Sequence, residues 1–229
     1  TEIYTLSLHD ALPISGQIQI EVLYCVLGPA TLRMTALSKG DSISVIGPLG
    51  NGFDIKKNKK HAILIAGGMG SPPILHLGKY IKQHYPDVQI TAFVGARQHD
   101  AFPFDIACDA KNRHIIQEFQ NIGLDSHIAT DDGSVGFKGF VTQKAGQWIE
   151  QNITNPDDAV IYSCGPEIML KNTAAMAKKI GIQCQVSMER MMACGIGLCQ
   201  SCAVQVNSGS KYKLCCKDGP VFDANEIVF

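Results

Sequence analysis

The sequence predicts an α/β protein in three parts: a partial antiparallel β-barrel, a parallel-sheet domain and a small cysteine-rich C-terminal domain. Three observations predict this architecture. Between residues 57 and 188, apolar strand-like runs alternate with helical stretches, which is typical of a parallel sheet covered by helices. Before this region, β-rich runs are broken by Gly-Pro turns. After it, five of the nine cysteines lie between Cys194 and Cys216.

The first part, residues 16–56, contains the strand-like runs 18–26 and 42–46, with turns at Gly28-Pro29 and Gly47-Pro48. It is too short to form a domain alone, so we interpret it as the remnant of a small barrel. Residues 1–15 look like the translation of a sequencing adapter joined to a truncated gene, and the chain begins with Thr rather than Met. We therefore expect them to carry no function; the alternative is a genuine first strand and turn.

The second part, residues 57–188, alternates between the two kinds of element. Strands are expected at 62–66, 90–94, 126–130, 159–163 and 183–188. Helices are expected at 72–83, 140–151 and 166–180. The third part, residues 189–229, shows little helical period, and a domain this small usually needs a staple, which cysteines could supply as metal ligands.

A glycine-rich turn joins the first of these strands to the first helix. It contains Gly67, Gly68 and Gly70, followed by Pro72 and Pro73. Glycines let a pyrophosphate approach the backbone, and a helix N-terminus favours negative charge. Further turns are expected at the same edge of the sheet, where an open α/β sheet binds its ligand. These are Gly95-Ala96-Arg97, residues 130–134 and Cys164-Gly165-Pro166. Together they predict a nucleotide site, although each turn alone can be purely structural.

The cysteines of the third part predict an iron–sulfur site. Cys194, Cys199 and Cys202 stand as C-x4-C-x2-C, the spacing of plant-type [2Fe–2S] proteins, and the fourth ligand arrives on a separate strand. Spacing alone leaves both Cys215 and Cys216 open for that role. The alternative is a structural zinc site, but zinc ribbons usually present two C-x2-C pairs, and only one is present here.

Composition excludes several classes of function. The formal net charge is −1 with no block of Lys or Arg, which gives no electrostatic reason to expect nucleic-acid or anionic-membrane binding. No apolar run approaches the roughly 18 residues of a transmembrane helix, and no signal peptide is visible, so we expect a cytoplasmic protein. No acid–base pair or nucleophile stands out, and no catalytic residue is predicted.

With these motifs in place, the chain resembles the ferredoxin reductase-like superfamily and, within it, the electron-transfer subunits of dihydroorotate dehydrogenase B. The segments that carry this resemblance are GPLGNGF (47–53), AGGMGSPP (66–73), TDDGS (130–134), CGPEIMLK (164–171), ERMMACGIGLCQSC (189–202) and CKDGPVFDANEI (216–227). The resemblance implies that Cys216 is the fourth cluster ligand. It also implies FAD in the barrel, NAD on the α/β domain, and an FMN-containing catalytic partner subunit in a heterotetramer with two copies of each subunit.

The resemblance further implies which residues contact the two nucleotides. For FAD they are Leu23, Tyr24, Cys25, Ala30 and Thr31, and for NAD they are Gly67, Gly68, Gly70, Cys164, Gly165 and Pro166. The flavin motifs usually include two arginines that are absent here, which removes partners of the FAD pyrophosphate. The sequence itself is neutral between NAD and NADP.

The expected function is an electron-transfer subunit of pyrimidine biosynthesis, an oxidoreductase component that passes electrons from FMN through [2Fe–2S] and FAD to NAD+. One alternative is an NAD(P)H-dependent flavin and iron–sulfur reductase subunit of a hydrogenase- or sulfur-reductase-type complex. Another is a non-catalytic metal-binding module.

Overall fold

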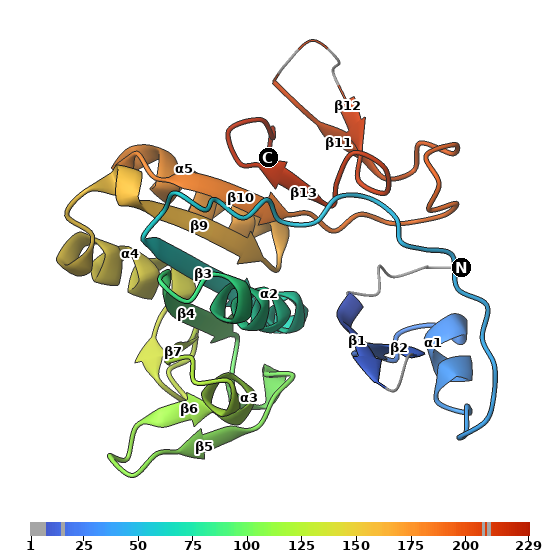
Figure 1. Cartoon of the computed structure of the whole chain (residues 1–229), viewed down its shortest axis with the longest axis horizontal. Helices are drawn as coiled ribbons and strands as arrows, with labels where there is room; N and C mark the ends of the chain where they lie inside the picture. Colours follow the sequence, from blue (N-terminus) through green and yellow to red (C-terminus); the bar gives the residue numbers. More distant parts are fainter. Residues whose placement is uncertain (1–7, 15–16, 208, 210–211) are drawn as a thin grey trace.

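The computed structural model describes residues 8–14, 17–207, 209 and 212–229, and its centre is a seven-stranded sheet (Figure 1). Six strands run parallel, and β13 pairs antiparallel with β10 at one edge. The spatial order is β13 (Val221–Asp223), β10 (Gln183–Ser187), β9 (Ala159–Cys164), β3 (His61–Gly67), β4 (Gln89–Ala96), β7 (Ser126–Thr130) and β8 (Phe137–Lys138). The expected parallel sheet is confirmed, and the five expected strands agree with observed ones to within two residues.

Strand β3 shows why the sequence alternates as it does. Ala62, Leu64 and Ala66 pack into the hydrophobic cluster on one face of the sheet, whereas Ile63 and Ile65 pack into the cluster on the other. All five are almost fully buried. Because both faces are covered, the strand reads as a continuous apolar run rather than as apolar–polar alternation.

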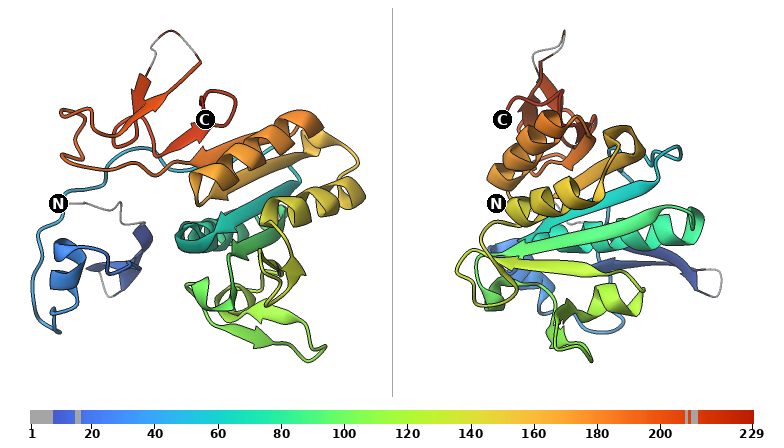
Figure 2. Two further views of the ribbon diagram at one scale, coloured as in Figure 1. Left: turned by 180° about the vertical axis from the view of Figure 1, so that it is seen from behind. Right: turned by 90° about the vertical axis from the view of Figure 1, so that its left-hand side faces the viewer.

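Helices cover both faces of this sheet (Figure 2). On the face of Leu64, buried residues of α2 (Ser71–His84) and α3 (Gln117–Asn121) complete the cluster. On the face of Ile63, residues of α4 (Val141–Asn152) and α5 (Glu167–Ile180) do the same. The three expected helices match α2, α4 and α5 to within one residue at each end. A hairpin of β5 (Ile106–Cys108) and β6 (His114–Ile116) lies beside α3.

The cysteine-rich C-terminal part, residues 189–229, is built against the same sheet. It contains the antiparallel pair β11 (Ala203–Gln205) and β12 (Tyr212–Leu214), and its β13 extends the central sheet. Buried Cys202, Val204 and Phe222 share one hydrophobic cluster with α4 and α5. The C-terminal part is therefore packed onto the parallel-sheet domain and not merely tethered to it.

The N-terminal part contains less β structure than the sequence led us to expect. β1 (Leu8–Ile14) pairs with β2 (Gln17–Val22), α1 (Pro29–Met34) follows, and an extended segment then leads to β3 (Figure 1). The strand expected at 42–46 is wrong: these residues have no strand partner and their side chains are exposed. A strand forms only where a neighbouring strand pairs with its backbone groups, and no described strand lies beside residues 42–46.

Strand β1 falls inside residues 1–15, which we interpret as foreign to the gene. A hairpin made by local pairing does not bear on that origin, so the interpretation stays a prediction. Across the described part of the chain, no helix combines the length and the apolar character that a membrane crossing requires.

Candidate functional site

Two loops meet at the C-terminal edge of the sheet, after strands β3 and β9. A Cβ atom on Gly70 would lie 2.1 Å from the carbonyl oxygen of Cys164, and one on Gly67 would lie 3.0 Å from Cδ of Pro166. Gly165 has φ of +153°, and a Cβ there would lie 2.9 Å from the Gly67 backbone. The loops therefore pack backbone against backbone, which only glycine permits at these points.

Gly68 differs from its neighbours because its surroundings are open. Its φ is +50°, and no atom lies within 4 Å of the place that a Cβ would take. Helix α2 begins three residues later, at Ser71, whose hydroxyl donates to the Gly68 carbonyl at 2.8 Å. An accessible glycine backbone in front of a 14-residue helix is a suitable place for a phosphate group.

Two more loops lie at the same edge, after β4 and β7. The backbone N–H and hydroxyl of Ser134 both donate to Asp132 Oδ1, at 2.9 and 2.7 Å, and the backbone N–H of His99 donates to Ser134 Oγ. The hydrogen bond from the Ser134 backbone and, after it, the one from the Ser134 hydroxyl hold the pKa of Asp132 below its usual value. The structure thus joins the loop at 130–134 to the one that follows Gly95-Ala96-Arg97, and all four expected turns lie on one edge.

The cysteine loop holds its sulfurs in two pairs. In the first pair, the backbone N–H of Cys199 donates to Cys194 Sγ at 3.4 Å. The Cys199 backbone, followed by the Ile196 backbone, lowers the pKa of Cys194 to about 6. Gly195 and Gly197 have φ of +73° and +82°, and these left-handed residues turn the loop's amides inward.

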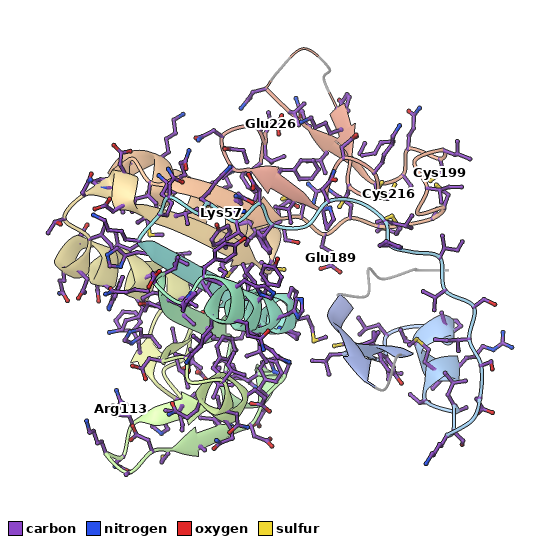
Figure 3. The ribbon with its side chains drawn as sticks, viewed as in Figure 1. Lys57, Arg113, Glu189, Cys199, Cys216 and Glu226 are labelled. Atoms are coloured by element: carbon purple, nitrogen blue, oxygen red, sulfur yellow. The ribbon has the colours of Figure 1, made fainter. Side chains whose placement is uncertain are left out.

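The second pair joins this loop to the turn after β12. The backbone N–H of Cys216 donates to Cys202 Sγ at 3.5 Å, and both residues are buried. Figure 3 labels Cys216 and Cys199 in the C-terminal part. Burial raises the pKa of Cys216, the neighbouring Cys202 thiol adds to the rise, and the Gly197 backbone opposes it. The structure therefore brings all four expected cysteines to adjoining loops. No group of three His, Cys, Asp or Glu side chains among the described residues is arranged to hold one metal ion.

Cys215 points elsewhere. Its thiol donates to the carbonyl of Met188 at 3.2 Å, its side chain is fully buried in the hydrophobic cluster, and burial raises its pKa to about 11. Spacing had left Cys215 and Cys216 equivalent. In the structure the Cys216 N–H donates to Cys202 Sγ, whereas the Cys215 N–H donates to the Cys202 carbonyl.

The five residues expected to contact FAD lie around α1 and form no comparable site. Thr31 is buried, and its hydroxyl donates to the Gly28 carbonyl while accepting from the backbone N–H groups of Leu27 and Gly28. Leu23 and Tyr24 are half-buried, and Cys25 and Ala30 are exposed. The Thr31 hydroxyl is therefore fully used in starting the helix.

Sequence reasoning missed an ion pair that links the two candidate sites. The Arg190 guanidinium donates to both carboxylate oxygens of Glu167, at 2.9 and 3.0 Å. Glu167 is the first residue of α5, directly after Pro166, and Arg190 lies just before the cysteine loop. Both residues belong to segments that carry the family resemblance, but no spacing rule relates side chains so far apart in the sequence.

Comparison with known proteins places both regions. The family described as the iron–sulfur cluster binding domain of dihydroorotate dehydrogenase B matches residues 189–228, and the oxidoreductase NAD-binding domain matches residues 64–175. Among solved structures, the NADH-dependent reduced ferredoxin-NADP oxidoreductase has a TM-score of 0.77 and 28% identity, covering 97% of this chain and 73% of that one. The CS-b5R domains of human Ncb5or have a TM-score of 0.56 and 19% identity, covering 78% and 52%, which shows the fold alone.

Curated relatives extend the likeness over most of the chain. The "Dihydroorotate dehydrogenase B (NAD(+)), electron transfer subunit" of Listeria monocytogenes is 41% identical over 90% of this chain and 74% of its own length. The protein of the same name from Clostridium perfringens is 34% identical over 92% of this chain and 76% of its own length. This chain belongs to the family of electron-transfer subunits of dihydroorotate dehydrogenase B (NAD+).

Proposed function

We propose that this chain relays electrons from an FMN-containing dihydroorotate dehydrogenase catalytic subunit to NAD+ in pyrimidine biosynthesis. Overall, dihydroorotate and NAD+ become orotate, NADH and one proton. The bound [2Fe–2S] cluster supplies one-electron transfer, FAD both one- and two-electron transfer, and nicotinamide hydride transfer. The chain's own residues hold and orient these groups, which agrees with the absence of a predicted acid–base pair.

The observation that carries the proposal is the arrangement of four sulfurs in two pairs. In a [2Fe–2S] site, four cysteines serve two irons, two on each. Zinc instead takes four donors around one ion, whereas the hydrogen bonds here join the cysteines two by two. We assign Cys194 and Cys199 to one iron and Cys202 and Cys216 to the other. The amides that face Cys194 would stabilise negative charge on the sulfurs.

The nucleotide site is proposed at the edge of the sheet. Gly68 leaves room for a phosphate in front of α2, and the close packing of Gly70 on Cys164 fixes the distance between the two loops. The residues that we assign to NAD are Gly67, Gly68, Gly70, Cys164, Gly165 and Pro166. On this assignment residues 57–188 form the NAD-binding domain and residues 189–229 the cluster domain.

The flavin is assigned to residues 16–56, the barrel remnant, on family resemblance. The residues assigned are Leu23, Tyr24, Cys25, Ala30 and Thr31. Since the Thr31 hydroxyl is used within α1, its contribution would be to shape the turn and not to donate to a phosphate.

An apolar surface around the cysteine loop is the proposed contact with the catalytic subunit. Met191, Ile196 and Leu198 are 69, 48 and 76% exposed and surround the cysteines that we assign to the cluster. Exposed apolar side chains that gather around a functional site are typical of a protein interface. Docking there would bring the partner's FMN next to the first electron acceptor on this chain.

We expect Leu198→Asp to weaken binding of the catalytic subunit by at least about tenfold, because a charge would be buried in the contact. Leu37→Asp, also at an exposed leucine but in the N-terminal part, is the matched control and should bind as the unchanged protein does. Calorimetric titration of the cluster-loaded variants with the catalytic subunit measures both. Equal affinity of the two variants would place the contact on another surface.

Co-expression with a dihydroorotate dehydrogenase catalytic subunit tests the proposed function as a whole. We expect the two chains to purify together and dihydroorotate to reduce NAD+ only when both are present. A catalytic subunit that reduces NAD+ equally well without this chain would refute the proposal.

For assembly, we propose two copies of each subunit in the cytoplasm. The support is family resemblance. Sedimentation of the co-purified complex gives its mass, and a complex with one copy of each subunit would contradict the stoichiometry.

A further inference from the structure

Residues 49–56, here called the strap, connect the N-terminal part to β3 and run along the cluster domain and the sheet (Figures 1 and 2). They contain no helix or strand. Yet the strap forms specific hydrogen bonds with both the cluster domain and the parallel-sheet domain. It therefore meets all three of the regions to which we assign a redox group.

At one end, Asn51 holds the turn that follows Cys216. Its backbone N–H donates to the Gly219 carbonyl at 2.5 Å, and its carbonyl accepts from the Val221 N–H at 3.4 Å. Its side-chain amide donates to the carbonyls of Lys217 and Asp218, at 3.3 and 3.2 Å. Asn51 thus forms hydrogen bonds with the backbone of four of the five residues that follow Cys216, a proposed cluster ligand.

The residues before Asn51 approach the same domain closely. Gly50 has φ of +72°, and a Cβ there would lie 2.3 Å from the Gly219 carbonyl oxygen. Leu49 Cδ1 lies 3.6 Å from the place of a Cβ on Gly195, in the cysteine loop. The strap therefore contacts both segments that supply the proposed cluster ligands.

At the other end, two buried side chains of the sheet hold the strap. Gln185 on β10 accepts from the Asp54 N–H at 2.9 Å and donates to the Asp54 carbonyl at 2.7 Å. Tyr162 on β9 accepts from the Lys56 N–H at 3.0 Å, and its ring meets Phe53 edge-on at 5.5 Å. Tyr162 and Gln185 are only 1 and 8% exposed, so these hydrogen bonds lie where water competes little.

We propose that the strap sets the separation between flavin and cluster, and that Asn51 and Gln185 are positioning residues for electron transfer between them. This inference rests on the proposed function. The segment assigned to FAD leads directly into the strap, so loosening either end lets that segment move relative to the cluster. Neither residue is a proposed ligand of any redox group. Removing either one should leave every site intact and change only how the sites lie relative to one another.

The variants are Asn51→Ala and Gln185→Met, each with a matched control: Asn58, two residues beyond the strap, for Asn51, and Gln183, also on β10, for Gln185. Asn58→Ala changes an exposed asparagine whose side chain makes no hydrogen bond to a described residue, and Gln183→Met changes an exposed glutamine of β10. All are studied in the full chain with cluster and FAD restored. The first readout is amide hydrogen exchange at residues 217–221 and 54–56. The second is the rate at which NADH reduces the cluster, in stopped flow.

We expect Asn51→Ala and Gln185→Met to speed exchange at their own end of the strap and to slow cluster reduction by about tenfold or more, since small displacements far from the reacting atoms can cost that much. The cluster spectrum and the dissociation constant for NADH should stay unchanged, as in both controls. Faster exchange with an unchanged reduction rate would overturn the inference while leaving the proposed function intact. Unchanged exchange would also overturn it. If NADH reduces no cluster in the unchanged protein, the proposed function fails first and the positioning role fails with it.

Discussion

Replacing Cys216 with serine is expected to remove the iron–sulfur chromophore, whereas replacing Cys215 with serine should leave it in place. Cys216 shares a hydrogen bond with Cys202 Sγ, while the Cys215 thiol donates to Met188 inside the hydrophobic cluster. A missing thiolate leaves one iron without a ligand, and serine is a poor substitute for sulfur as a donor to iron. Visible absorption with iron and sulfide assays on anaerobically purified variants makes the measurement.

The pair of variants controls itself because the two cysteines are adjacent and both buried. Cys215→Ser keeps a donor for the Met188 carbonyl and should cost no more than about 1–3 kcal/mol of unfolding free energy. A chromophore that survives Cys216→Ser and disappears in Cys215→Ser would reverse the assignment. Loss in both, with native circular dichroism, would mean that the whole turn and not one sulfur governs assembly.

Gly70→Ala is expected to abolish NADH binding, with the dissociation constant rising by at least about a hundredfold, or roughly 2.7 kcal/mol. The new Cβ would stand 2.1 Å from the Cys164 carbonyl oxygen and 2.6 Å from the Gly165 nitrogen. Both neighbours are backbone atoms, so the clash can be relieved only by separating the two loops. Quenching of NADH fluorescence on titration with the protein measures the affinity.

Gly52→Ala is the matched control, because nothing lies within 4 Å of a Cβ at that position and its φ is not positive. It should bind NADH as the unchanged protein does. If Gly70→Ala fails to fold, Gly68→Ala provides the second test. Its Cβ enters open space, and the left-handed backbone at φ +50° costs an alanine about 1–2 kcal/mol. We expect the variant to fold, so that a loss of affinity reports on access to the backbone. Unchanged affinity in both loop variants would mean that the nucleotide binds elsewhere.

The local sequence pattern was sufficient to locate the strands and helices of the parallel-sheet domain. Strands such as β3 are apolar on both faces and end in glycines, and helices such as α2 carry a proline pair in their first turn. The hydrophobic period and these glycines and prolines therefore locate the elements to within two residues. The glycines of the nucleotide loop were also predictable as a group. Their separate roles were not, because the clash at Gly70 and the open space at Gly68 depend on where another loop lies.

The failures have a common physical cause, which is dependence on distant partners. The apolar run 42–46 has strand composition, but a strand needs a neighbour, and the described residues offer none. Cys215 and Cys216 are equivalent in spacing and differ only in which way the turn points each thiol. Asn51, Gln185 and the Arg190–Glu167 ion pair act across more than a hundred residues or between loops, and no local pattern marks them.

The visible spectrum of anaerobically purified protein, recorded before and after NADH and with iron, sulfide and zinc assayed on the same sample, tests the central claim most directly. We expect equal amounts of iron and acid-labile sulfide, the absorption of a [2Fe–2S] cluster, and bleaching of cluster and flavin bands by NADH. Iron and sulfide without a flavin band would confirm the cluster and would show that residues 16–56 alone do not hold FAD. Zinc in place of iron, in protein kept free of oxygen, would contradict the account.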